Sequence, residues 1–555
     1  MYFKKIKKYF EKDPYMPFVI LVAIVAFVLR IWGITWGIPI GDYSNYYHPD
    51  EGKIVNGVFT FPDHIQSNTD LRYPTFYHYS LGILWYPIKA IVDFAINDLN
   101  LLYPDGSIDM YLFCFIFVRF FTVLLGTATV LLIYVYSKKI YNSKVAILAS
   151  IFVTITMFHV QNSSWTTVDV PTAFFLILTL YLANCMIFHR KTSYYLYSAI
   201  ASGILIGTKY TGGLVIASVI IFHVLAMSKH GELTSIKDIK KIFDKNIILY
   251  LFITCIVFLV TTPGAFLKTE YFINSLYYET NRLSINKCSM LELNVWIPHI
   301  INHLKRTMGW SLSVVSILGF IYAFHLSTKK PHKELPILLF MGLYFLNLRN
   351  VLAARYLIMI APLFCILAAK FIVDLYESES KTRKAFVSFI AIFIILSSSI
   401  YTVQSIQERT TDTRIIASEY ISNNIARGSS ISDSGYIGNY ARWEWNLPRI
   451  DSEKYDVKSC FEKPDYIVLT SFRFVPMAKA LNSPNLGDNY TWDENYSTMW
   501  YRQVIPESEV FLFYDDLLNN KSQKYNYSLV KSFKQEPKIP IEFPAPEIRI
   551  YGKNQ

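Results

Sequence analysis

The sequence predicts a polytopic α-helical membrane protein with about eleven transmembrane helices, in a range extending to twelve or thirteen, and a small C-terminal α/β exterior domain. Three observations lead to this fold class. Apolar runs of bilayer length recur along residues 1–404 of a 555-residue chain that is 53% hydrophobic and 16% aromatic. Short basic clusters separate these runs, as orientation signals do. Beyond residue 404 the chain becomes polar and aromatic, with short strand-like segments.

The first apolar run, from Pro17 to Gly37, is long enough to span a bilayer. No small-residue cleavage site follows it, so we expect a retained helix rather than a signal peptide. The lysines before it place its start in the cytoplasm, and residues 38–112 therefore lie outside. Because no Lys or Arg occurs from Asp93 to Tyr111, we expect the weaker run 74–92 to lie along the membrane surface or to re-enter.

The remaining apolar runs alternate across the bilayer in agreement with the basic loops. We expect spans at 113–137, 145–161, 170–188, two short ones within 194–227, 246–262, 310–326, 335–348, 353–373 and 385–403. An exterior turn at 207–213 joins the two short spans, and 264–308 forms an exterior loop. The chain thus divides into a transmembrane domain, 1–404, and an exterior domain, 405–555.

The net charge of +11 does not indicate nucleic-acid binding, because the basic residues cluster in the connections between apolar runs. The six cysteines are scattered, and most of them lie inside apolar runs. Their spacing predicts neither a zinc site nor a disulfide framework. We expect no required cofactor and no nucleic-acid partner.

An acidic pair, Asp50 and Glu51, follows the first span at the membrane–water boundary, where acids without a partner are costly. One carboxylate of such a pair can remove a proton from an acceptor hydroxyl while the other orients that group or holds a metal ion. The alternative is a solvated loop pair. Asp169 precedes another span, where it can open the next helix, act in catalysis, or do both.

Basic residues are predicted on the same side of the membrane. The Lys209 ammonium, set among glycines, can neutralise a lipid phosphate or extend to the interface. Arg349 and Arg355 can bind phosphate through paired N–H donors or anchor the following span. Arg119 opens a span and can pair with an outer acid. We predict that this face binds substrate through His48, Arg119, Lys209, Glu279, Arg282, Arg349, Arg355 and Tyr356.

These residues fall in short motifs that follow one another along residues 17–375. They are His48-Pro49-Asp50-Glu51, Tyr73-Pro74, Arg119 with Leu124–Val130, Val168-Asp169-Val170-Pro171, the turn around Lys209, Thr262-Pro263 and Arg355-Tyr356. In this set and order the chain resembles the C-type (GT-C) polytopic membrane glycosyltransferases. Within them it is similar to the protein O-mannosyltransferase and aminoarabinose-transferase superfamily. Its residues around Lys209 depart from those of many relatives.

The resemblance implies a GT-C-like fold and inverting transfer of a sugar from a polyprenyl-phosphate carrier at the exterior face of the plasma or inner membrane. It implies that the acid after the first span, here Asp50 or Glu51, acts as base or positions the acceptor. In the mechanism that we expect, Asp50 is the favoured base and Glu51 or Asp169 orients the acceptor. Lys209 and Arg355 are the candidates for holding the carrier phosphate. The acceptor can be a protein, a lipid or a glycan, as in protein glycosylation or cell-envelope synthesis.

Two alternatives follow from the same residues. An enzyme similar to oligosaccharyltransferases or polymerases would transfer a preassembled glycan, with a divalent cation held at Asp50 and Glu51. A non-enzymatic transporter of lipid-linked sugars would place ionisable residues near mid-bilayer. The charges of this chain are instead predicted to gather at one face, which favours the enzyme.

Overall fold

The computed structural model describes residues 13–38, 48, 50–97, 110–233, 236–284, 293–329, 331–348, 354–377, 380–410, 412–432, 450, 454–458, 462–471, 509–519, 525–535 and 547–554. The chain divides into two compact units. The first comprises residues 1–35 and 50–405, and the second comprises 36–49 and 406–555. Each unit has a hydrophobic core of its own.

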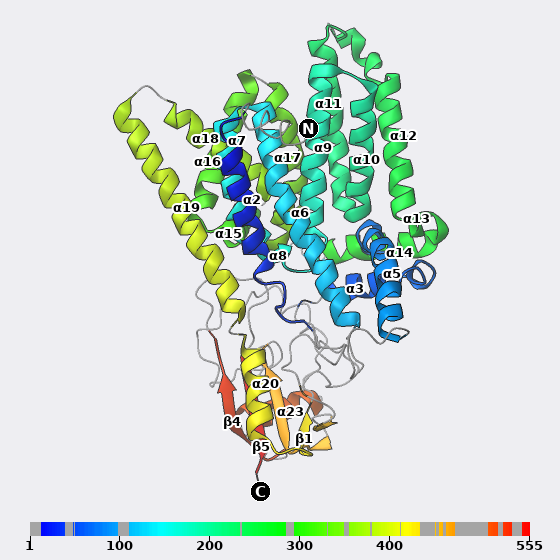
Figure 1. The fold of residues 1–555 in the computed structure, drawn as a ribbon, viewed down its shortest axis with the longest axis vertical. Coiled ribbons are helices and arrows are strands. Elements are labelled where there is room, and N and C mark those ends of the chain that lie inside the picture. The colour runs from blue at the N-terminus through cyan, green and yellow to red at the C-terminus, as the bar shows by residue number, and fades with distance from the viewer. Residues whose placement is uncertain are drawn as a thin grey trace. The chain divides into compact units, whose positions relative to one another are not determined.

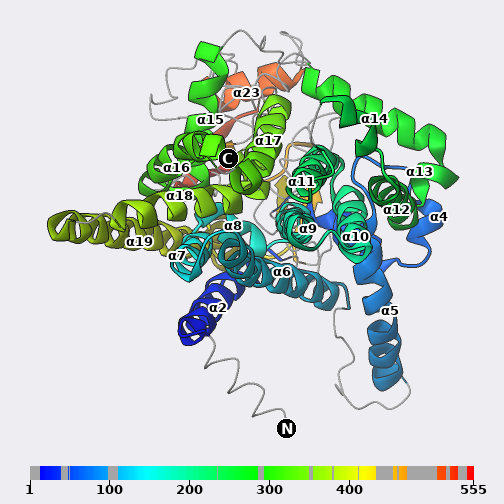
Figure 2. The same cartoon turned by 90° about the horizontal axis from the view of Figure 1, so that it is seen from above.

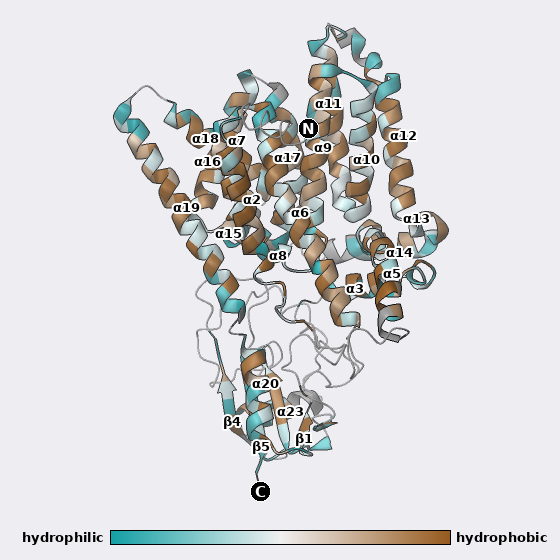
Figure 3. Ribbon diagram, in the orientation of Figure 1, coloured by the Kyte–Doolittle hydropathy of each residue, from teal (hydrophilic) through white to brown (hydrophobic). Residues whose placement is uncertain are grey.

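The first unit is a bundle of apolar helices (Figures 1 and 2). Within the described residues, five helical runs are long and apolar enough to cross a bilayer. They are α6 (Met110–Ile140), α9 (Asp169–His189), η1 with α11 (Tyr210–Leu214 and Val215–Lys229), α16 (Trp310–Lys329) and the run that opens with α19 (Lys381–Thr410). Two shorter apolar helices are α2 (Met16–Ile31) and α12 (Lys245–Thr261). The predicted class, a multi-span helical membrane protein, is confirmed, and Figure 3 shows the apolar colouring along these helices.

A further span is bent. α7 (Ser143–Thr154) and α8 (Met157–Ser163) meet at an angle of 62°, so the continuous span predicted over 145–161 is broken. Side chains satisfy the backbone carbonyls that the break exposes. The buried Arg30 donates from Nη2 to the Val153 carbonyl at 3.2 Å, and Thr402 donates to the Ile155 carbonyl at 2.8 Å. Tertiary contacts therefore stabilise a break that no proline or glycine marks in the sequence.

The remaining bundle helices are α10 (Thr192–Thr208), α17 (Pro331–Leu348) and α18 (Ala361–Tyr376). α18 is buried along most of its length and packs against α16 and α7. The contact with α16 is close enough to require glycine, because a Cβ at Gly319 would lie 2.5 Å from the Leu367 carbonyl oxygen. α10 packs between α9 and α12.

Further helices lie toward one end of the bundle (Figure 1). They are α3 (Glu51–Phe59), α4 (His64–Ser67), α5 (Phe76–Asn97), α13 (Gly264–Leu267), α14 (Thr269–Ser284) and α15 (Leu293–Met308). α5 covers the weak run 74–92 and is not among the runs that qualify as membrane spans. Three short 3-10 helices, η1, η2 (Ile236–Ile242) and η3 (Ala354–Met359), connect longer elements.

The second unit contains the predicted strands. A five-stranded sheet has the order β2-β1-β3-β5-β4, with bounds Ser430–Ser432 (β1), Asp456–Lys458 (β2), Tyr466–Thr470 (β3), Tyr527–Phe533 (β4) and Ile548–Lys553 (β5). β1 pairs in parallel with β2 and β3, whereas β5 is antiparallel to β3 and β4. The helices α20 (Thr413–Asn424) and α23 (Glu509–Asn519) complete the described part. The predicted α/β character of the C-terminal region is confirmed.

Candidate active site

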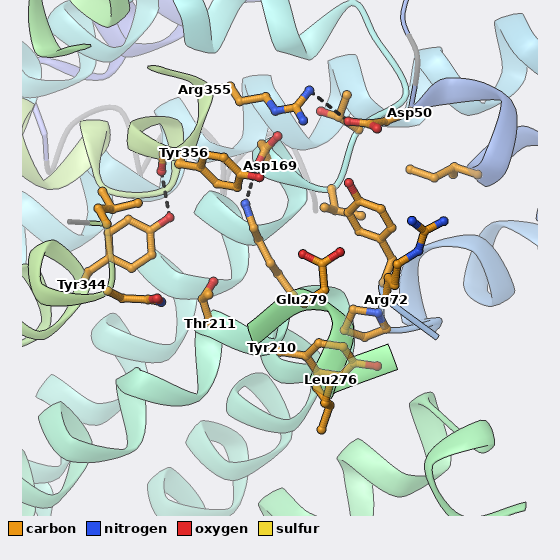
Figure 4. Close-up of a pocket in the computed structure, with 18 residues that line it drawn as sticks. Asp50, Arg72, Asp169, Tyr210, Thr211, Leu276, Glu279, Tyr344, Arg355 and Tyr356 are labelled. Atoms are coloured by element: carbon orange, nitrogen blue, oxygen red, sulfur yellow. Dashed lines mark hydrogen bonds and ion pairs between the residues drawn. The ribbon is translucent and has the colours of Figure 1, made fainter. Parts of the chain in front are cut away.

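A cavity of about 220 Å³ lies within the first unit, where α3, α9, α14, α17, η1 and η3 meet (Figure 4). Its charged lining residues are three acids and three bases. Those six are Asp50, Asp169, Glu279, Arg72, Lys209 and Arg355. Four tyrosines also line it, at positions 73, 210, 344 and 356. Segments from residue 50 to residue 356 thus contribute to one polar cavity.

Asp50 occupies the N-cap position of α3, but its side chain does not cap that helix. The Asp50 Oδ2 atom instead lies 2.9 Å from Nη1 of Arg355, which η3 carries. The Asp50 side chain is 28% exposed and that of Arg355 is 10% exposed, so the pair lies in the cavity wall with access from the cavity. Figure 4 shows the two groups facing one another.

Glu51, the next residue, has a different environment. Its side chain is fully buried and does not line the cavity. Arg119 on α6 donates to it from Nε at 2.8 Å and from Nη2 at 2.6 Å, and the Thr166 backbone N–H donates at 2.7 Å. Arg119 also donates to the Ile34 carbonyl at 2.6 Å. Glu51 therefore joins α3 to α6 and to the loop that leads into α9.

A second ion pair also lines the cavity. Asp169 is the first residue of α9, and Lys209 stands between α10 and η1. The Lys209 Nζ atom lies 2.6 Å from Asp169 Oδ1 and 4.5 Å from the centre of the Tyr356 ring. Burial disfavours the charged ammonium, but the negative charge of Asp169 outweighs it and raises the pKa of Lys209.

The Tyr356 ring is shared by both candidate phosphate-binding cations. The Arg355 guanidinium carbon lies 5.7 Å from the ring centre, on a ring that Lys209 also contacts. The hydroxyl of Tyr344 donates to the Tyr356 carbonyl at 2.8 Å, which fixes this part of η3. An ammonium and a guanidinium are thus held beside the same aromatic ring.

The charge of Asp50 acts on Tyr73, a neighbouring residue of the cavity lining. The negative charge of Asp50, together with burial, raises the pKa of Tyr73 well above its usual value. Tyr73, which lines the cavity, therefore keeps its phenolic proton at neutral pH.

Asp70 does not line the cavity, but it pairs with two basic residues, one of which, Arg72, does. Arg72 donates to it from Nε at 2.8 Å, and Lys53 Nζ lies 2.8 Å from its Oδ2 atom. Burial raises the pKa of the Asp70 carboxyl, but these two cations outweigh it and hold that pKa below its usual range. The hydrogen bond to Asp70 thus holds Arg72 in the cavity lining.

The structure brings together Asp50, Asp169, Lys209, Glu279, Arg355 and Tyr356 among the predicted site residues. Glu51 and Arg119 pair behind the cavity, and His48 is buried and does not line it. Arg282 belongs to α14, and Arg349 lies outside the described residues.

Sequence reasoning did not select Arg72, Thr167, Tyr344 or Asn347, which also line the cavity. Tyr344 and Asn347 lie within an apolar run, where neither differs from an ordinary span residue. The predicted alternative, a divalent cation held by Asp50 and Glu51, can be compared with the contacts of these two carboxylates. Both Glu51 oxygens accept hydrogen bonds from protein donors, and the described residues contain no group of three or more potential metal ligands from His, Cys, Asp and Glu.

Comparison with known proteins bears on part of this site. Residues 113–264 match the family model of dolichyl-phosphate-mannose-protein mannosyltransferases. The match spans about a quarter of the chain and includes Arg119, Asp169 and Lys209, whereas Asp50 and Arg355 lie outside it. It confirms the resemblance that the ordered motifs indicated.

An uncharacterised protein of Aquifex aeolicus is 31% identical over 120 residues, which are 21% of this chain and 24% of that relative. The chain thus matches about a quarter of the length of that curated relative. One similar solved structure is archaeal oligosaccharyltransferase AglB from Archaeoglobus fulgidus, in complex with an inhibitory peptide and a dolichol-phosphate. It aligns at 11% identity and a TM-score of 0.49, over 98% of this chain and 89% of that one. ArnT from Cupriavidus metallidurans bound to undecaprenyl phosphate aligns at 12% identity and a TM-score of 0.43 over 83% of this chain and 95% of that one.

Proposed function

We propose that the chain transfers a sugar from a polyprenyl-phosphate-linked donor to an acceptor, with inversion, at the exterior face of the membrane. The observation that carries this proposal is the convergence of two carboxylate–cation pairs in one cavity, Asp50–Arg355 and Asp169–Lys209. The donor class is supported by the family model matched by residues 113–264, which is named for a dolichyl-phosphate sugar. The exterior face is supported by the distribution of basic loops in the sequence.

In this proposal the donor phosphate binds beside the Tyr356 ring, where Lys209 and Arg355 supply positive charge. As the bond between the anomeric carbon and the phosphate oxygen breaks, its electron pair leaves with the phosphate. The two cations are already in place to stabilise that developing charge, so little reorganisation is needed in the transition state.

Asp50 is the proposed base. Its carboxylate is partly exposed to the cavity, whereas both oxygens of Glu51 are engaged by Arg119 and Thr166. Asp50 removes the proton of an acceptor hydroxyl as the acceptor oxygen bonds to the anomeric carbon from the side opposite the phosphate. Asp169 holds Lys209 and orients the reacting groups.

The cavity size favours transfer of a single sugar over a preassembled glycan. Its volume of about 220 Å³ is below the roughly 300–1,000 Å³ of pockets that enclose drug-sized ligands. A hexose or pentose fits this scale, and a protein, lipid or glycan can supply the acceptor hydroxyl.

The test is transfer of radiolabelled sugar from synthetic polyprenyl-phosphate sugars by the purified full chain, with endogenous membrane extract as acceptor. We expect Asp50→Asn to lower the rate by about a hundredfold or more, because one general base is removed. Asp456→Asn, which alters an exposed acid paired with Lys458 on the sheet, is the matched control and should transfer at the wild-type rate. Equal rates for Asp50→Asn and wild type would place the base elsewhere.

A further inference from the structure

Two threonine hydroxyls in the cavity lack hydrogen-bond partners. The Oγ1 atoms of Thr167 and Thr211 are buried and have no hydrogen-bond partner among the residues that the structure describes. Both residues line the cavity, and Thr167 is only 2% exposed. A buried hydroxyl without a partner costs stability, and these two belong to residues beside a cavity that a ligand can enter.

Each threonine lies close along the chain to a charged residue of the cavity lining. Thr167 lies two residues before Asp169, and Thr211 lies two residues after Lys209. The two threonines therefore bracket, along the chain, the Asp169–Lys209 ion pair of 2.6 Å. Figure 4 shows Thr211 in the wall of the cavity that also holds Asp169 and Tyr356.

The backbone around each threonine is held in place. The Thr166 N–H donates to Glu51 at 2.7 Å, which anchors the loop that carries Thr167. On the other side, the Tyr210 hydroxyl donates to the Leu71 carbonyl at 2.7 Å, and Gly212 N–H donates to the Lys209 carbonyl at 2.9 Å. These bonds fix the turn that carries Thr211. The two threonines are thus held beside the cavity by rigid segments.

We propose that the hydroxyls of Thr167 and Thr211 donate hydrogen bonds to the phosphate oxygens of the lipid-linked donor, in the cavity that Lys209 also lines. This inference rests on the proposed function and extends its phosphate site beyond the two cations. An anionic oxygen beside an ammonium is the acceptor that makes a neutral hydroxyl bond strongest, because the bond becomes charge-assisted. The hydroxyls then gain hydrogen-bond partners in the complex with the lipid.

Binding and stability are expected to respond in opposite directions. Replacing a threonine hydroxyl by the similar-shaped valine removes a donor for phosphate, but it also removes a buried polar group that has no partner. We therefore expect Thr167→Val and Thr211→Val each to weaken binding of a synthetic polyprenyl monophosphate about tenfold. Neither variant should lower the melting temperature of the protein without lipid.

The chain offers a matched control. Thr179, on α9, is fully buried, its Oγ1 atom also lacks a partner among the described residues, and it does not line the cavity. It lies about 15 Å along the helix from Asp169, from the rise per residue. Thr179→Val should bind the lipid as the wild type does. Thr167→Ser and Thr211→Ser, which restore the hydroxyl, should recover most of the affinity.

The measurement is equilibrium binding of the polyprenyl monophosphate to the purified full chain in detergent, with melting curves taken on the same samples. Wild-type affinity in Thr167→Val and Thr211→Val would overturn the inference while leaving the proposed function intact. Loss of affinity together with a lowered melting temperature in the absence of lipid would also overturn it, because the role would then be structural. No lipid binding by the wild type would instead count against the proposed function itself.

Discussion

Asp50 and Glu51 are neighbours at the start of α3, yet their side chains have different surroundings. Asp50 is partly exposed to the cavity and pairs with Arg355, a residue of η3. Glu51 is fully buried and accepts hydrogen bonds from Arg119 of α6 and from the Thr166 backbone. In the first pair, Arg355 can release Asp50 and bind an anionic ligand instead. The second connects α3 and the loop before α9, which both carry cavity-lining residues, to α6.

The difference indicates that one acid of this short motif is available to a ligand, whereas the other stabilises the fold. An ion pair that is open on one side can be disrupted at modest free-energy cost. A fully buried pair is different, because removing one partner leaves an uncompensated charge without water. Variants of the two acids should therefore fail in different ways, and the following predictions use that contrast in order of decreasing effect.

Glu51→Gln should lower the free energy of unfolding by about 3 kcal/mol, because the Arg119 guanidinium would remain buried without its counter-charge. Chemical denaturation in detergent measures this change. Asp50→Asn serves as the comparison and should lie within about 1 kcal/mol of wild type. Equal destabilisation by both substitutions would contradict the division between the two acids.

Exchanging the acids, as Asp50→Glu with Glu51→Asp, should lower the transfer rate about a hundredfold while keeping the net charge. The shorter acid at position 51 no longer reaches Arg119 as Glu51 does, and the longer acid at position 50 shifts the base by about one bond length. Single-turnover transfer measures the effect. A wild-type rate in the exchanged variant would show that either acid can serve at either position.

Arg355→Gln should weaken binding of polyprenyl monophosphate about tenfold, because one charge-assisted contact to phosphate is lost. Arg355→Lys should lose less, since it keeps the charge and gives up the paired donors. Titration with lipid in detergent gives both affinities. Unchanged affinity in Arg355→Gln would remove this arginine from the proposed phosphate site.

Asp50→Asn has a smaller and opposite expected effect on the same titration. The Asp50 carboxylate, whose Oδ2 atom lies 2.9 Å from Nη1 of Arg355, competes with a phosphate for this guanidinium. Removing that charge should tighten binding of the monophosphate about threefold, even though transfer is lost. Weaker binding would mean that Asp50 supports Arg355 rather than competing for it.

The sequence predicted much of the fold because the patterns are local. Apolar runs identified the multi-span bundle, and the strand-like character of the chain beyond residue 404 agrees with strands such as β3. The bend between α7 and α8 could not be predicted, because Arg30 and Thr402, which satisfy the carbonyls around it, are distant in the sequence.

The site divides in the same way. A common membrane face was enough to predict that Asp50, Asp169, Lys209 and Arg355 lie near one another. It could not show which acid of the pair faces the cavity, because that depends on the Arg119 guanidinium and a backbone N–H at residue 166. Arg72 was missed for a similar reason, since its orientation is set by Asp70.

The balance of charge around the cavity has a consequence for turnover. Three acids and three bases line it, so the formal charge of these six side chains is zero. In the proposed reaction the donor phosphate is a singly charged diester, whereas the polyprenyl phosphate left behind gains a second ionisable oxygen. The same cations attract this product more strongly than they attracted the donor. Departure of the spent carrier, rather than formation of the glycosidic bond, is then the step expected to limit the steady-state rate. Accumulated polyprenyl phosphate should accordingly act as a competitive inhibitor.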